Sequence, residues 1–421
     1  MKNLIIALFI IAVFLMPGFC AEAQAGDNAL QPLTLDDCFK LALKQSELIA
    51  IDAEKINQAE AHFLEAFGAI LPQVSFVRTN TRQHSVSTPS YNKGFEQKFV
   101  FQQELFSGFK EFAGIAVSKF EKKQRENEKL RAEQLLFVDV SDSFYLYVEL
   151  QEDSKALQSI RNALSKRISE LKTRENIGKS RTSEVVSTQT QLYNIDAEIE
   201  LVKSQAAIAR ELLEFLIGRP AEKVVEEGFD FSLKDESDYT HKAILRADVQ
   251  AANLAWKVSQ EGIAVAKSGF YPELNLTSDY YGHRFSVPRD ASWDALLSLN
   301  VPIFEGTTVY GQVKEARSVA KQNELLFKRA ERVAAQDVHD AYTNMQFNIS
   351  RGKVLDRALK SAELNFHLQI QDYNLNVVNN LDVITAIQNL EDARRSSIHS
   401  TYEGRRFYWQ LMAAAGEIEV K

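Results

Sequence analysis

The 421-residue sequence is poor in the residues that interrupt a chain, with 17 glycines and 8 prolines. Because these residues supply most turns, their scarcity predicts long, uninterrupted elements. No run of 18 apolar residues follows the N-terminal segment, which argues against a transmembrane helix. There are only two cysteines, Cys20 and Cys38, so a disulfide framework is excluded.

The sequence also lacks the motifs of catalysis and of nucleic-acid binding. Its seven histidines form no pair at metal-binding spacing, and no Gly-x-Ser-x-Gly sequence occurs. Gly178-Lys-Ser180 matches only the end of a phosphate-binding loop, because Thr173 stands where that motif needs glycine. The net charge of −8 is spread along the chain without a basic patch. We therefore expect no enzymatic activity, no cofactor, no metal and no nucleic-acid partner.

Residues 1–25 have the form of a secretory signal. Lys2 precedes an apolar run over residues 4–16, and small-x-small sequences follow at 21–23 and 23–25. An exported chain without a transmembrane helix is either free in the periplasm or inserted as a β-barrel. Cys20 follows the bulky Phe19, which disfavours lipidation without deciding it. Once the signal is removed, Cys38 would be the single cysteine of the chain. It stands in a helical pattern of apolar residues, which predicts a buried position.

Residues 105–218 and 303–416 align with a constant offset of 198 and no gap. For example, Lys123 and Glu126 of the first copy align with Lys321 and Glu324 of the second. The chain is therefore one structural unit written twice, over 26–218 and 241–421. An acidic, irregular segment at 219–240 joins the two units. A repeat of this length predicts a pseudo-symmetric architecture instead of a short solenoid.

Each unit is expected to begin with a helix and a β-hairpin. The helices are predicted over 34–67 and 239–267, and the hairpins over about 73–106 and 273–303. Their strands have roughly 9–12 residues, about the length at which a tilted strand crosses a membrane. Four strands leave exposed edges unless copies join. From these stretches alone, a soluble β-domain remains an equal alternative.

A very long helical hairpin follows each β-hairpin. Residues 109–177 contain no proline, which predicts a helix of roughly 100 Å. Its leucines recur every seven residues at 150, 157, 164 and 171, and its partner over 182–217 alternates apolar spacings of three and four. This is the pattern of a coiled-coil seam. The second unit repeats the design over 307–375 and 381–415, with Ser397, Ser400 and Gly404 in its last seam. These small residues predict either closer helix packing or weaker packing.

With these features in place, the chain resembles the outer-membrane efflux proteins, the TolC-like family. The resemblance covers about residues 30–418 and rests on the order and doubling of short motifs, namely Arg246-Ala-Asp-Val249, Leu71-Pro72, Leu105-Phe-Ser-Gly108, Ile303-Phe-Glu-Gly306, Asn380-Leu-Asp-Val383 and Leu216-Ile-Gly218. It implies a mainly α fold with a pair of β-hairpins and a twofold internal repeat. Three chains would form a twelve-stranded membrane β-barrel that continues as a long coiled-coil α-barrel.

The resemblance also implies a function. The homotrimer would be the outer-membrane channel-tunnel of a tripartite efflux or type I secretion system in a Gram-negative cell. It would contact outer-membrane lipid, a periplasmic adaptor and an inner-membrane pump, and it would act as a passive conduit. A soluble periplasmic coiled-coil adaptor or structural protein is the alternative, and an unrecognised enzyme is a second. Adaptors lack doubled, membrane-length hairpins.

The site residues that the resemblance implies lie near the two hairpin turns. Ser183, Glu184 and Tyr373 match entrance-closing positions, whereas Val378 stands in place of the arginine that completes the link. Asp382 matches an acid of the entrance ring, and a helix cap is the equally weighted alternative for it. The adaptor is expected to dock on the turns, whose residues are Ile177, Gly178, Lys179, Ser180, Asn376, Val377, Val378 and Asn379.

Overall fold

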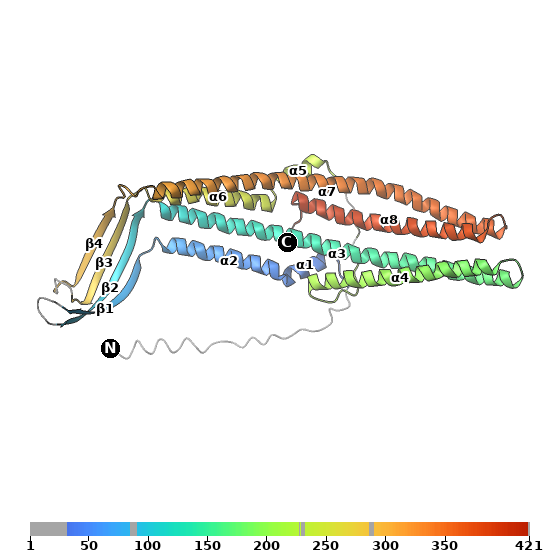
Figure 1. Cartoon of the computed structure of the whole chain (residues 1–421), viewed down its shortest axis with the longest axis horizontal. Helices are drawn as coiled ribbons and strands as arrows, with labels where there is room; N and C mark the ends of the chain where they lie inside the picture. The colour runs from blue at the N-terminus through green and yellow to red at the C-terminus, as the bar shows by residue number, and fades with distance from the viewer. Residues whose placement is uncertain (1–31, 85–90, 227, 229–231, 286–289, 420–421) are drawn as a thin grey trace.

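The computed structural model describes residues 32–84, 91–226, 228, 232–285 and 290–419. These residues form an elongated molecule with a four-stranded sheet at one end (Figure 1). Two long helical hairpins run side by side away from the sheet, and their turns lie together at the opposite end. The predicted signal at 1–25 lies outside the described residues.

The internal repeat is present in the helix boundaries themselves. The first hairpin pairs α3 (Lys110–Asn176) with α4 (Thr182–Ile217), and the second pairs α7 (Thr308–Asn374) with α8 (Asn380–Ala415). Every boundary in the second hairpin lies 198 residues after its counterpart. The left-handed backbone repeats as well, with φ 72° at Gly178 and φ 58° at Asn376. Asparagine tolerates this conformation, so it can replace glycine in the second turn.

The short helices depart from the prediction, because each expected helix is broken in two. The first divides into α1 (Leu35–Gln45) and α2 (Glu47–Gly68), and the second into α5 (Glu236–Ala243) and α6 (Ala247–Ser268). Ser46 has an extended backbone and its hydroxyl accepts a hydrogen bond from the Ile49 amide at 3.4 Å. It therefore ends one helix and caps the next. Helix α5 also takes in residues that the sequence assigned to the connecting segment.

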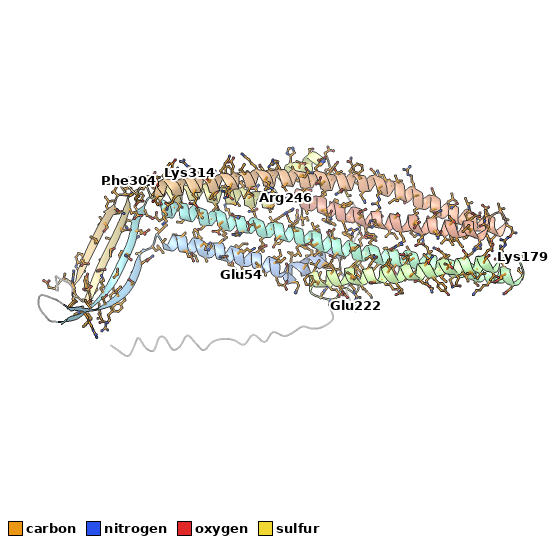
Figure 2. All side chains as sticks on the ribbon, viewed as in Figure 1. Glu54, Lys179, Glu222, Arg246, Phe304 and Lys314 are labelled. Carbon is orange, nitrogen blue, oxygen red and sulfur yellow. The ribbon has the colours of Figure 1, made fainter. Side chains whose placement is uncertain are left out.

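The contacts of Arg246 give a structural reason for the Arg246-Ala-Asp-Val249 motif at the start of α6. Its side chain is 1% exposed and forms ion pairs with Asp248 at 2.7 Å and Asp337 at 2.9 Å. It also donates a hydrogen bond to the backbone carbonyl of Ala414 at 3.1 Å. The arginine thus joins the start of α6, the middle of α7 and the end of α8, in the central part of the molecule (Figure 2).

The sheet is antiparallel in the order β1-β2-β3-β4, with strands β1 (Gln73–His84), β2 (Tyr91–Ser107), β3 (Glu273–His283) and β4 (Trp293–Asn300). Strands β2 and β3 pair, so one sheet joins the two units. Cross-strand partners of one face are largely apolar, namely Val74, Phe76, Phe99, Phe101, Leu274, Leu276, Tyr280, Trp293, Leu297 and Leu299. No helix of the described residues is long and apolar enough to cross a bilayer.

The predicted coiled-coil seam of the first hairpin is confirmed. Leu157, Leu164 and Leu171 of α3 are fully buried, and they share one apolar cluster with Ile195, Ile199, Val202 and Leu213 of α4. In the second hairpin, a Cβ on Gly404 would lie 2.6 Å from Asn348 Oδ1 of α7. The small residues of α8 therefore permit closer helix approach, the first of the two predicted alternatives. Cys38 is a buried free thiol, as expected.

Candidate functional site at the hairpin turns

The two hairpin turns form the end of the molecule farthest from the sheet, where Lys179 is labelled (Figure 2). Residues 177–181 connect α3 to α4, and residues 375–379 connect α7 to α8. The apolar side chains of this end are largely exposed: Ile177, Leu375, Val377 and Leu381 are 63–72% accessible to solvent. Exposed apolar side chains clustered at one end are typical of a contact surface.

Tyr373 and Glu184, which the sequence placed in the entrance, contact each other within one chain. The tyrosine hydroxyl donates a hydrogen bond to Glu184 Oε2 at 3.2 Å, and the Ser180 hydroxyl donates to the same oxygen at 2.6 Å. Asn380 Nδ2 donates to the Glu184 carbonyl at 3.3 Å and to Thr188 Oγ1 at 3.0 Å. Polar contacts therefore hold the two hairpins together just behind their turns.

Arg167 of α3 completes this cluster, and the sequence reasoning missed it. Its guanidinium lies 3.7 Å from the centre of the Tyr373 ring, and Nε and Nη2 donate to Asn380 Oδ1 at 3.2 and 3.1 Å. The side chain is only 5% exposed. Burial lowers the pKa of Arg167 from its ordinary value, yet an arginine stays charged at neutral pH. We refer to Arg167, Glu184, Tyr373 and Asn380 as the tip cluster.

A sequence signal for Arg167 exists in hindsight. It stands three residues after Leu164 and four before Leu171, a spacing that places a residue in the seam. A charge at such a position is normally costly unless a partner satisfies it. Arg167 forms an ion pair with Glu170 of its own helix at 3.4 Å, and its hydrogen-bond partner Asn380 lies on the other hairpin, 213 residues away along the chain. Sequence spacing within one helix cannot reveal so distant a partner.

The remaining predicted entrance residues have local surroundings. Val378 is half-buried and packs against the apolar cluster that contains Tyr373 and Val383. Ser183 is exposed. The exposed Asp382 takes part in a capping box: its carboxylate accepts from the Asn379 amide at 3.0 Å, and its own amide donates to Asn379 Oδ1 at 3.2 Å. The capping alternative thus describes the contacts of Asp382 in one chain.

The family model described as "Outer membrane efflux protein" matches residues 39–219 and 243–417. The chain belongs to this family. It is similar to the outer membrane protein TolC of Vibrio cholerae, with 22% identity over 390 residues that cover 88% of each chain. Two solved structures share its fold. The outer membrane protein VceC of Vibrio cholerae has a TM-score of 0.81 at 18% identity over 91% of this chain and 96% of that one. CusC has a TM-score of 0.83 at 16% identity over 91% and 92%.

Membership of the outer membrane efflux family gives the cellular location and the general role of the protein. It is an outer-membrane channel of an efflux system, and its helical part lies in the periplasm. The family is one of channel proteins. The interpretation as a soluble periplasmic adaptor is therefore set aside, and the doubled β-hairpins that distinguished the two are both present.

Proposed function

We propose that three copies of this chain close into one continuous conduit, which exports solutes passively across the periplasm and the outer membrane. Strands β1 and β4 are the two edges of the sheet in the described residues. An unpaired edge invites a further strand, so β4 of one copy can pair with β1 of the next. Two copies would supply eight strands, whose interior is filled by side chains. Three copies supply twelve, enough to leave a water-filled passage.

The helices carry a matching pair of exposed apolar surfaces. On α7, exposed apolar residues recur at multiples of seven, and we call them the α7 stripe: Val319, Leu326, Val333, Phe347, Val354 and Leu368. On α4, exposed apolar residues recur every seven or eight, and we call them the α4 stripe: Val186, Tyr193, Leu201, Ile208 and Phe215. Heptad spacing is the signature of a coiled-coil contact, and neither stripe has a partner helix within the described chain.

The placement of the two stripes carries the proposal. Helices α7 and α4 lie along opposite long edges of the molecule (Figure 1). A contact between the α7 stripe of one copy and the α4 stripe of the next is therefore head-to-tail. Such a contact builds a closed ring when the rotation between copies closes. The same rotation would close the sheet and the helices together, which gives one wall around one passage.

The hairpin turns would form the periplasmic entrance and the docking surface of the adaptor. Their exposed apolar residues offer a contact area, and the pump behind the adaptor would supply the energy. In the entrance, the tip cluster would hold the two hairpins of each chain together, so that Arg167 compensates for valine at 378. Three Asp382 carboxylates near the axis would favour cations in addition to capping α8. The chain itself would catalyse no reaction.

The mass and conductance of the purified protein test this proposal. In detergent, light scattering should give the mass of three chains, and the complex should form discrete channels in a planar bilayer. A matched charge substitution separates surface effects from contact effects. Leu326→Asp lies in the α7 stripe, whereas Lys328→Asp lies about 200° around the same helix. Only the first should dissociate the complex. A monomeric, non-conducting wild type would contradict the proposal.

A further inference from the structure

A basic pocket lies where the second helical unit meets the sheet. It has a volume of about 320 Å³ and is formed by the end of α6, the residues just before β3 and the first turns of α7. Lys314 marks this position, close to the helix end of the strands (Figure 2). Three cationic side chains line the pocket, namely Lys267, Lys314 and Arg317. Neither the tip cluster nor the contact between copies uses them.

The charge of this pocket is not neutralised from within the chain. Its lining contains no acidic residue, and in the described part of the chain no ion pair involves Lys267, Lys314 or Arg317. By contrast, Lys321 and Lys328, further along α7, pair with Glu324 at 2.9 and 2.6 Å. Three exposed cations that converge without a counter-charge attract an anionic ligand.

Aromatic side chains complete the lining. Phe270 is 55%, Tyr271 46% and Tyr310 66% exposed to solvent. Phe270 and Tyr271 come two to three residues before β3 begins at Glu273, so they mark the helix end of the membrane-length strands. Aromatic rings of this kind, beside lysine and arginine, are typical of the boundary between a bilayer and water. The pocket therefore lies at the depth of the lipid headgroups on the periplasmic side.

The first unit does not repeat the three cationic residues of this pocket, although its backbone repeats the second. In the alignment of the two units, Phe67 corresponds to Lys267 at an offset of 200, and Ala116 corresponds to Lys314 at an offset of 198. Of the three cationic positions, only that of Arg317 has a cation in the first unit, at Lys119. The nearby Lys122 pairs with Glu60. Since the fold repeats and the charge does not, the fold alone does not require the cationic lining. The difference points to a ligand of the second unit.

The proposed contact between copies would leave the pocket open. Val319 of the α7 stripe follows Lys314 by five residues, which turns it about 140° around the helix. Between them lies Val309, which is buried and faces Gly269 at the end of α6, and the buried Val313 lines the pocket on the same side. A neighbouring copy seated on the α7 stripe would thus approach from a different side of α7.

We propose that this pocket binds the headgroup of an anionic phospholipid of the outer membrane's periplasmic leaflet. Lys267, Lys314 and Arg317 contact the phosphate, and Tyr310, Phe270 and Tyr271 pack against the glycerol and the first acyl carbons. Arginine and lysine are the usual phosphate partners, and an anionic lipid supplies charge and apolar chain together. The inference rests on the outer-membrane location of the chain and does not depend on the number of copies.

Native mass spectrometry of the detergent-purified full chain tests the site. Phosphatidylglycerol and phosphatidylcholine are titrated separately into the wild type, and we expect one retained phosphatidylglycerol per chain. Each neutral substitution, Lys267→Gln, Lys314→Gln or Arg317→Gln, should weaken its binding about fivefold, and the triple variant about 100-fold. The controls are Lys321→Gln on the same helix and Lys119→Gln in the first unit, which should bind as the wild type does.

The outcomes separate the possible ligands. Equal retention of both lipids, or unchanged retention in the triple variant, would overturn the site. If inorganic phosphate displaces phosphatidylglycerol completely at equal concentration, the site takes a free anion, and the lipid assignment is wrong. Channel conductance of the same variants is recorded in parallel, because loss of lipid with normal conductance leaves the proposed conduit intact. If the triple variant does not assemble, the three single variants provide the same comparison.

Discussion

Replacing Arg167 with alanine removes a buried cation that contacts Tyr373 and Asn380 on the other hairpin. A desolvated cation–π contact contributes about 0.5–2 kcal/mol. Hydrogen bonds from a charged donor contribute about 1.5–3 kcal/mol. Together they amount to roughly 2–4 kcal/mol between the two hairpins, because these terms are not fully additive. If the tip cluster holds the entrance closed, its loss should raise the ratio of open to closed states about 30-fold or more.

Single-channel recording in planar bilayers measures this ratio directly. The matched control is Arg161→Ala, six residues earlier on α3. Arg161 pairs at 2.6 Å with Asp196 of α4, so its ion pair lies within one hairpin and does not join the two. This variant should leave the open fraction unchanged. Tyr373→Phe keeps the ring beside Arg167 and removes only the bond to Glu184, so its effect should be intermediate.

A double-mutant cycle of Arg167→Ala with Tyr373→Leu, which removes the ring that Arg167 contacts, isolates the coupling between the two residues. Equal open fractions in the wild type, Arg167→Ala and Arg161→Ala would refute the reasoning. In that case the hairpins would be held together elsewhere along α3 and α8.

The remaining predictions concern the entrance acid, the contact between copies and a buried carboxyl. Asp382→Asn should reduce cation preference and block by divalent cations in single-channel recordings, and its weaker capping should cost about 0.5–1 kcal/mol; unchanged selectivity with this loss of stability would leave Asp382 as a cap only. Leu326→Asp should shift the light-scattering mass from three chains toward one, since a charge buried at a contact costs at least about 2 kcal/mol, whereas Lys328→Asp should not. Burial raises the pKa of the Glu391 carboxyl, so the free energy of unfolding falls as the pH rises from the carboxyl's ordinary pKa through the raised one, and the loss is complete above it. Glu391→Gln should therefore raise the thermal midpoint by about 1–2 °C at pH 7.5, and the difference should disappear below about pH 4, where the carboxyl is protonated in both states; an equal shift at both pH values would contradict this assignment.

Much of the fold follows from the sequence because the signals are local and doubled. The constant offset of 198 predicts two hairpins, and the helix boundaries obey it at every end. The seam leucines predict α3 packed on α4, since heptad spacing fixes which side of a helix is buried. The break after α1 was missed because Ser46 is a single capping residue within a continuing apolar pattern. The break after α5 was missed because residues 244–246 contain neither glycine nor proline.

The candidate site could be predicted only in part, because its contacts join the two hairpins. Glu184 and Tyr373 were placed together by resemblance, and the structure shows their hydrogen bond at 3.2 Å. Arg167 was not found, since Tyr373 and Asn380 lie on α7 and α8 and nothing in the spacing of α3 indicates these contacts. Asp382 shows the opposite case. Its cap is a contact of three residues within one helix end, whereas a role in an entrance ring depends on other copies.

The head-to-tail ring of three chains is the central claim, and one crosslinking measurement tests it most directly. Tyr193 lies eleven residues after α4 begins and Leu364 lies ten residues before α7 ends, so the two are level along the hairpins. Both are exposed, at 63% and 61%, on opposite long edges of the chain. The double variant Tyr193→Cys, Leu364→Cys in a Cys38→Ser background, oxidised in native outer membranes, should give covalent species of one, two and three chains and nothing larger. Species that stop at two chains, continue beyond three or do not form at all would contradict the ring.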